Sequence, residues 1–180
     1  MTPRRRGRIV AGVLLIVFGG GLLVLALVAI LQSDDNAKPL PRSLRAALDD
    51  ATRSPAHAPF AGLTQARIAL ARRCLLVVVA DSERERSVGL MNRTDLGDYA
   101  GMLFVVPTET SNPFTMAGTQ VPLDIAWFRA DGTRTGSAQM VPCRAAVSNC
   151  PLYRPPGEWR FALETRRGEL PAGNLAACTA

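Results

Sequence analysis

One carboxylate that interrupts an apolar run is the first candidate for chemistry. Residues 122–128, PLDIAWF, carry a single charge, Asp124, and a polar loop at residues 116–120 precedes them. In a strand, Asp124 shares its face with Ala126 and Phe128, because alternate side chains point the same way. A shielded charge without partners is costly, so we expect Asp124 to accept hydrogen bonds from groups nearby.

Two sets of donors are candidates for Asp124: the backbone N–H groups of residues 118–120 and the guanidinium of Arg93. Gly118 favours the first set, because glycine allows turn conformations that point several N–H groups inward. In one interpretation Asp124 only holds this loop in place. In the other, a ligand shares the donors, and Arg93, Thr119 and Asp124 form its binding site.

Other catalytic patterns receive less support. A Ser-His or Cys-His pair needs a histidine in the domain, and the only histidine, His57, precedes it. Paired carboxylates can act as acid and base. The carboxylates available are Asp95, Asp98, Glu109 and Asp124. Four methionines lie in the same domain: Met91, Met102, Met116 and Met140. We interpret them as core residues, and the alternative is a metal site made of their thioether groups. We expect no cofactor and no metal.

The cysteines predict two disulfides, because an even number in an oxidising compartment is typical of a disulfide framework. Cys143 and Cys150 enclose six residues that include a turn-forming Ser-Asn pair, and we predict that they bond to each other. Elimination then pairs Cys74 with Cys178. A zinc site has little support, since no Cys-x-x-Cys motif is present.

An uncharged run of 23 residues, 9–31, predicts a transmembrane helix. At about 1.5 Å per residue it spans roughly 35 Å, enough for a hydrocarbon core of about 30 Å. Four arginines precede it and QSDDNAK follows, so the positive-inside rule predicts a cytoplasmic N-terminus and an extracytoplasmic remainder. A cleavable signal peptide is the alternative, but its apolar core is shorter, about 7–15 residues. We therefore expect an uncleaved, single-pass anchor in the cell membrane.

The net charge of +6 does not indicate a nucleic-acid partner. Four of the 21 basic residues flank the apolar run, which leaves 17 basic against 15 acidic residues in the rest of the chain. No basic run with interleaved aromatic residues occurs there. The expected partners are the membrane and a small ligand or envelope component, and no nucleic acid.

The remaining elements predict a mainly β domain. Proline-rich residues 32–62 form the expected linker, with a short helix at 42–51, and a capping box at Ser82 and Glu85 starts a helix over about 83–89. An Asp-Gly turn within 129–132 predicts a hairpin. Six strands are predicted at 64–70, 74–80, 101–107, 122–128, 133–141 and 158–165. The fold class is a compact barrel or sandwich with one or two short helices, preceded by the transmembrane helix.

Several short motifs resemble, in order and spacing, the domain of unknown function 192 family of bacteria and archaea over residues 66–165. They are Gly89-Leu90-Met91 with Arg93, Gly101-Met102-Leu103-Phe104, Met116 with Thr119 and Pro122-Leu123-Asp124-Ile125, Met140-Val141-Pro142-Cys143, Cys150-Pro151 with Tyr153, and Ala162-Leu163-Glu164. The resemblance implies a compact, mainly β fold that is often exported and has no established reaction. The family usually has an aromatic residue before the methionine and Lys-Asn-Thr after it. This chain instead has Thr115 before Met116 and Ala117-Gly118-Thr119 after it.

These features predict a membrane-anchored extracytoplasmic protein. Its parts are cytoplasmic residues 1–8, the transmembrane helix 9–31, the linker 32–62 and the globular domain 63–180. We expect it to bind a small ligand or another envelope component. The alternative is a small envelope enzyme that uses carboxylates as acid and base. A cavity where Arg93 and Thr119 converge on Asp124 would favour binding, and two carboxyl groups facing each other across a cleft would favour the enzyme.

Overall fold

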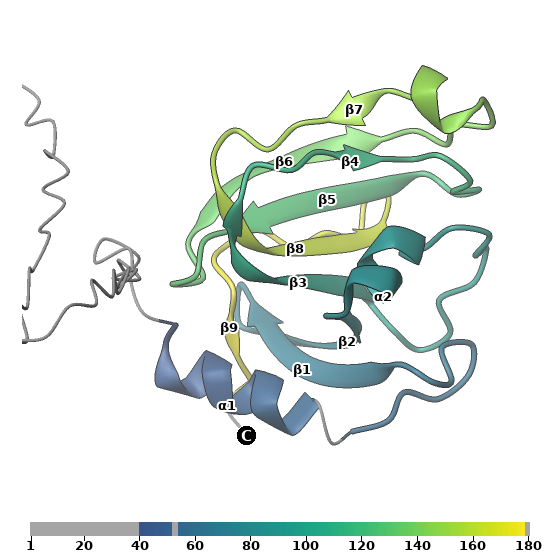
Figure 1. The fold of residues 1–180 in the computed structure, drawn as a ribbon. Coiled ribbons are helices and arrows are strands. Elements are labelled where there is room, and N and C mark those ends of the chain that lie inside the picture. The colour runs from purple at the N-terminus through teal and green to yellow at the C-terminus, as the bar shows by residue number, and fades with distance from the viewer. Residues whose placement is uncertain (1–39, 52–53, 179–180) are drawn as a thin grey trace, which may run out of the picture. The chain divides into compact units, whose positions relative to one another are not determined.

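A curled, half-barrel sheet dominates the computed structural model, which describes residues 40–51 and 54–178 (Figure 1). Two short α-helices accompany the sheet, so the mainly β class predicted from the sequence is confirmed. The predicted transmembrane helix, 9–31, and the basic residues before it lie outside the described residues. Within the described part, no helix has the length and apolar character needed to cross a membrane.

Seven strands form the main sheet in the order β6-β5-β8-β3-β2-β1-β9, and β4 and β7 form a small second sheet. Neighbouring strands are antiparallel except for β2 and β3, which are parallel. The strands are β1 Thr64–Leu70, β2 Arg73–Ala80, β3 Gly101–Thr110, β4 Phe114–Thr115, β5 Leu123–Phe128, β6 Arg134–Met140, β7 Leu152–Tyr153, β8 Trp159–Arg166 and β9 Ala176–Ala177. The six predicted strands correspond to β1, β2, β3, β5, β6 and β8 and are confirmed.

Local sequence signals explain the turns and the helix α2, Glu83–Val88. Ser82 caps α2 by accepting from the backbone N–H of Glu85, whose side chain accepts from the Ser82 N–H in return. The predicted hairpin joins β5 to β6 through residues 129–132. Gly132 has a φ of 82°, and a Cβ there would lie 2.2 Å from the carbonyl oxygen of Leu175, so only glycine fits this turn.

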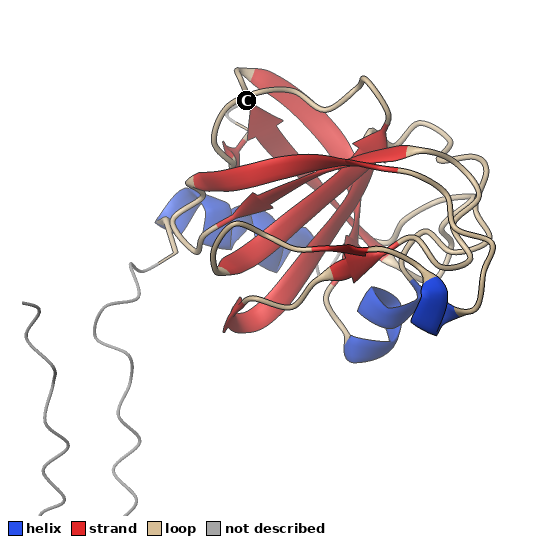
Figure 2. Ribbon diagram, turned by 90° about the horizontal axis from the view of Figure 1, so that it is seen from above, coloured by secondary structure: helices blue, strands red, loops and turns tan. Residues whose placement is uncertain are grey.

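Residues that the sequence analysis assigns to the linker contribute to the core. Helix α1, Arg42–Ala51, packs against β1 and buries Leu44 completely. Ala56 and Phe60 are also buried, and the backbone N–H of Ala56 donates to the carbonyl of Leu63 at 2.9 Å. Helices α1 and α2 lie at different sides of the sheet (Figure 2).

The sheet buries apolar side chains on both faces. Ile125 and Trp127 of β5 belong to one buried cluster, together with Phe104 and Ala162; we call this the Trp127 face. The opposite side, the Phe128 face, contains strand residues that alternate with them, Leu103, Ala126, Phe128, Phe161 and Leu163, and Leu44 of α1 packs there as well. All six residues of β5 are buried, as expected for a strand covered on both faces.

Strands β3 and β8 approach each other closely near the end of β8. Met102 pairs with Glu164, Phe104 pairs with Ala162, and Gly101 pairs with Thr165. A Cβ on Gly101 would lie 1.9 Å from the backbone oxygen of Glu164. Position 101 therefore has no room for a side chain while this register is kept.

Both predicted disulfides are present. Cys143 bonds to Cys150 across seven positions, and Cys74 bonds to Cys178 across 104 positions. Cys178 directly follows β9, which pairs with β1, so the longer bridge joins the C-terminal strand to β2.

Candidate functional site

Asp124 is buried as predicted, but its predicted partners are wrong. Its carboxylate accepts from the backbone N–H of Gly168 at 2.7 Å, and Nε of Arg167 lies 3.9 Å from Oδ1. Asp124 is 8% exposed and alternates with Ile125 of the Trp127 face. The loop at 116–120 packs on that Trp127 face through Met116. The two are therefore on opposite sides of the sheet, and Asp124 holds the turn after β8 instead.

The other two predicted site residues also have separate environments. Arg93 donates to the carbonyl of Pro59, and its guanidinium lies 4.7 Å from the ring centroid of Phe60. Thr119 is only 5% exposed and lines a cleft that neither Arg93 nor Asp124 lines. The structure thus does not bring the three residues together. A ligand contact by Arg93 or Asp124 stays a prediction.

A cleft of about 790 Å³ lies on the Trp127 face. Its walls come from α2 and the turn that follows it, from the end of β3 with residues 107–115, and from Ala117 and Thr119. Val147, within the loop closed by the Cys143–Cys150 disulfide, also contributes. This volume lies in the range of small-molecule sites, about 300–1,000 Å³.

Glu164, on β8, is the acidic group buried in this cleft. Strand pairing places it between Met102 of β3 and Ile125 of β5, and the side chain is 4% exposed. No hydrogen bond or ion pair joins its carboxyl group to any residue that the structure describes. Burial raises the pKa of Glu164 to about 8, because a low-dielectric environment disfavours the charged form.

Three aromatic rings form one wall of the cleft. The rings of Phe104 and Phe114 meet edge to face with centroids 5.1 Å apart, and Phe114 lies 5.2 Å from Trp159. The indole N–H of Trp159 donates to the carbonyl of Asn112 at 3.0 Å, which fixes the ring. The wall therefore presents apolar ring surface to the cleft.

The other charged groups that line the cleft are Glu83 and Arg86 of α2. Arg86 directs Nη1 to the backbone carbonyls of Asp81 and Val105, the latter at 2.9 Å. Glu83 is exposed to solvent. Neither forms an ion pair with Glu164 within the described part of the chain.

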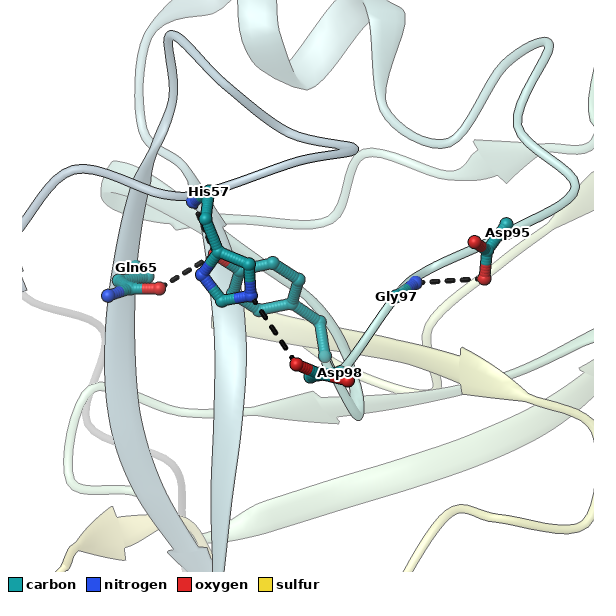
Figure 3. A network of polar contacts seen from close by, with 6 residues as sticks. His57, Gln65, Asp95, Gly97 and Asp98 are labelled. Carbon is teal, nitrogen blue, oxygen red and sulfur yellow. Dashed lines mark hydrogen bonds and ion pairs between the residues drawn. The ribbon is translucent and has the colours of Figure 1, made fainter.

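A second polar cluster surrounds His57 and has a structural explanation (Figure 3). The Tyr99 hydroxyl accepts from the backbone N–H of His57 at 2.9 Å and donates to Oε1 of Gln65 at 2.7 Å. The His57 ring stacks on Tyr99 and lies 3.8 Å from a carboxylate oxygen of Asp98. The Tyr99 hydroxyl also lies 2.9 Å from Nδ1 of His57. These contacts hold residues 54–62 against β1.

Glu164 is a site residue that the sequence does not predict. Alternation along β8 puts Glu164 in register with Glu158 and Arg160, a pattern typical of a polar, solvent-facing side and unlike the isolated charge at Asp124. The predicted carboxylates Asp95, Asp98 and Glu109 do not line the cleft. Of the four methionines, Met102, Met116 and Met140 are buried in the core, and Met91 lines the cleft.

Comparisons with known proteins place residues 66–177 within the model of one family, DUF192, described as an uncharacterized ACR. No curated protein matches the chain. One similar crystal structure is that of a protein of unknown function from Novosphingobium aromaticivorans DSM 12444. Its sequence is 26% identical to this chain, the TM-score is 0.57, and the match covers 68% of this chain and 91% of that chain. A second is the crystal structure of a putative transcription regulator from Sinorhizobium meliloti 1021. Its sequence is 25% identical to this chain, the TM-score is 0.51, and the match covers 61% of this chain and 88% of that chain.

Proposed function

The chain belongs to the DUF192 family, and we propose that it is a membrane-anchored extracytoplasmic protein that binds a small ligand in the cleft containing Glu164. One observation carries the proposal: Glu164, a residue that is 4% exposed, lines the cleft, and its carboxyl group has no partner among the described residues. Buried polar groups are nearly always hydrogen-bonded. A ligand would supply the missing partner.

Thr119 adds a second polar group to the same cleft. Its side chain is 5% exposed, and its hydroxyl makes no hydrogen bond to the described residues. Small-molecule sites combine apolar walls with a few convergent polar groups. The aromatic wall, the Glu164 carboxyl and the Thr119 hydroxyl together supply this combination.

The proposed location rests on the sequence. The apolar run at 9–31 and the arginines before it support a single-pass anchor with residues 32–180 outside the cytoplasm. Two disulfides are consistent with an oxidising compartment. N-terminal sequencing of the protein from the membrane fraction tests the anchor, because a mature chain that begins near residue 30 would reveal a cleaved signal peptide.

The enzyme alternative has less support. It needs two carboxyl groups that face each other at the reacting bond. Glu83 and Glu164 both line the cleft, but Glu83 is exposed and no contact joins the two. Asp95, Asp98, Glu109 and Asp124 lie outside the cleft lining. A binding function therefore explains the arrangement better.

A ligand screen with matched variants tests the binding function. The full-length protein, in lipid nanodiscs, would be screened by thermal shift against envelope metabolites and sugars. Thr119→Val removes a hydroxyl at nearly constant shape, and Glu158→Gln changes an exposed carboxylate outside the cleft. We expect hits whose shift falls in Thr119→Val and persists in Glu158→Gln. If the thermal shift caused by every hit stays the same in Thr119→Val and in Glu164→Gln, the proposed site is contradicted.

A further inference from the structure

We propose that the ligand of this cleft is an organic ammonium ion, whose positive charge pairs with Glu164 and whose alkyl groups contact Phe104 and Phe114. This inference rests on the proposed function and specifies its ligand class. Three features of the cleft support it: a carboxyl group that lacks a counter-ion, a wall of aromatic rings beside that group, and the scarcity of further metal ligands.

The missing counter-ion is the first feature. Glu164 has uncharged neighbours on the two adjacent strands, Met102 and Ile125. Arg86, the cation among the lining residues, is bound to backbone carbonyls. Glu83 is itself acidic and cannot serve as a counter-ion. A buried carboxylate without a partner is strongly disfavoured, so Glu164 keeps its proton in the empty cleft, and a cationic ligand would supply the counter-ion that the ionised form lacks.

The aromatic wall is the second feature. Phe104 pairs with Ala162, two residues before Glu164 on the same strand face, so its ring is a diagonal neighbour of the carboxyl group. From Phe104 the ring contacts continue to Phe114 and Trp159. Aromatic rings attract cations through their negative faces, and alkylammonium groups are the usual ligands of such walls. A carboxylate beside this aromatic wall therefore suits an ammonium ion with an apolar body.

The donor set argues against a metal ion as the cation. Metal sites in proteins generally use three or more ligating side chains. The described residues contain no group of three His, Cys, Asp or Glu side chains placed to hold a metal. Glu164 and the Thr119 hydroxyl would leave most of a metal's coordination unfilled. A neutral, hydroxylated ligand is the remaining competitor, and it forms one outcome of the test below.

The test compares choline with its neutral carbon analogue, dimethylbutanol, by isothermal titration calorimetry. The full-length protein is held in nanodiscs of phosphatidylglycerol, which has no ammonium head group. We expect choline to bind at least about ten-fold more tightly than dimethylbutanol, a difference of roughly 1.4 kcal/mol. Equal binding of the two, or no binding by choline and by a panel of primary amines, would overturn the inference.

Proton release provides a readout specific to Glu164. An ammonium ion binds the carboxylate, and burial raises the pKa of Glu164 to about 8. Binding near pH 7 should therefore release about one proton, seen as a dependence of the heat on the buffer. Affinity should rise about ten-fold per pH unit between about pH 6 and pH 7. If choline binds without releasing a proton and its affinity does not change with pH, pairing with Glu164 is contradicted.

Matched variants separate this inference from the proposed function. Glu164→Gln should abolish choline binding, whereas Glu158→Gln should leave it unchanged. If instead a neutral sugar or alcohol binds and depends on Thr119, the ligand site stands and the ammonium inference fails. If neutral and cationic compounds both bind with the same affinity to the native protein and to the variants at Thr119 and Glu164, the proposed site fails as well.

A lipid head group and a free amine share this chemistry, so a second arm distinguishes them. The titration is repeated in nanodiscs that contain phosphatidylcholine. If head groups enter the cleft, they compete, and free choline should bind at least about ten-fold more weakly than in phosphatidylglycerol. Unchanged affinity would identify a free ammonium compound as the ligand.

Discussion

Asp124 and Glu164 lie on neighbouring strands but point to opposite faces of the sheet. Asp124 pairs with Thr165 across β5 and β8, and Glu164 pairs with Ile125. The Asp124 carboxylate binds the turn at Arg167 and Gly168, whereas Glu164 lines the cleft. The two carboxyl groups share no partner. We therefore expect substitutions of Asp124 to change stability and substitutions of Glu164 to change binding.

Glu164→Gln should remove a pH dependence of stability. Burial raises the pKa of Glu164 from its ordinary 4.5 to about 8, so between these values the folded protein keeps a proton that the unfolded chain releases. The native protein then loses stability as pH rises through this window, by an amount on the order of 4 kcal/mol. Gln does not titrate, so the variant should gain in relative stability toward pH 8.

The measurement is urea unfolding at several pH values, followed by the fluorescence of Trp127 and Trp159. Both tryptophans lie in the described domain, so their emission reports its unfolding. Glu158→Gln serves as the control and should follow the native pH profile. Parallel profiles for Glu164→Gln and the native protein would show that the Glu164 carboxyl is solvated.

Ala117→Lys should supply an internal cation to the cleft. Ala117 is 4% exposed and lines the cleft. We expect the lysine ammonium to pair with Glu164 and to prevent choline binding. The pair should show a coupling energy of about 1–3 kcal/mol in a double-mutant cycle with Glu164→Gln. A coupling energy near zero would mean that the two positions do not meet.

Asp124→Ala should destabilise the turn after β8. It leaves the N–H of Gly168 without its acceptor, which should cost about 1–3 kcal/mol. Asp124→Asn can still accept from Gly168 and loses only the pairing with the half-exposed Arg167, worth less than about 1 kcal/mol. Urea unfolding of both variants checks this order. Glu158→Gln, a change at an exposed carboxylate, should match the native protein.

The two disulfides should differ in their contribution to stability. In the chain-entropy model, closing a loop of about 100 residues stabilises by about 4.7 kcal/mol and a loop of seven by about 2.5 kcal/mol. Removing Cys74 and Cys178 together, which are 104 positions apart, should therefore cost more than removing Cys143 and Cys150. Thermal unfolding of the two double alanine variants tests the ranking, and a reversed order would refute it.

Strand periodicity made most of this fold predictable. The alternation of Leu123 to Phe128 predicted which side chains share a face, and both disulfide pairings followed from spacing and elimination. The two-residue strands β4, β7 and β9 could not be predicted, because a repeat of two needs several residues to be visible. Their positions depend on contacts between distant segments.

The partners of Asp124 could not be predicted for a similar reason. Sequence reasoning chose the nearest donors along the chain, residues 118–120, whereas Gly168 is 44 positions away and is brought close by the β5–β8 pairing. Glu164 was missed because its importance depends on the cleft around it. Burial of Glu164 follows from β8 lying between β3 and β5, an order that local patterns do not contain.

The close contact of β3 with β8 also bears on how relatives of this chain can diverge. Two motifs of the family resemblance pair with each other and lie side by side in the sheet: Gly101 to Phe104 on β3 and Ala162 to Glu164 on β8. No side chain fits at Gly101 without moving the backbone of Glu164, so mutation is restricted there. Residues 111–113, by contrast, lie in the connection between β3 and β4 beside the cleft, and connections generally tolerate change. The cleft therefore combines a rigid floor, where Gly101 admits no side chain, with a connecting segment at its wall whose side chains can be replaced without moving the sheet.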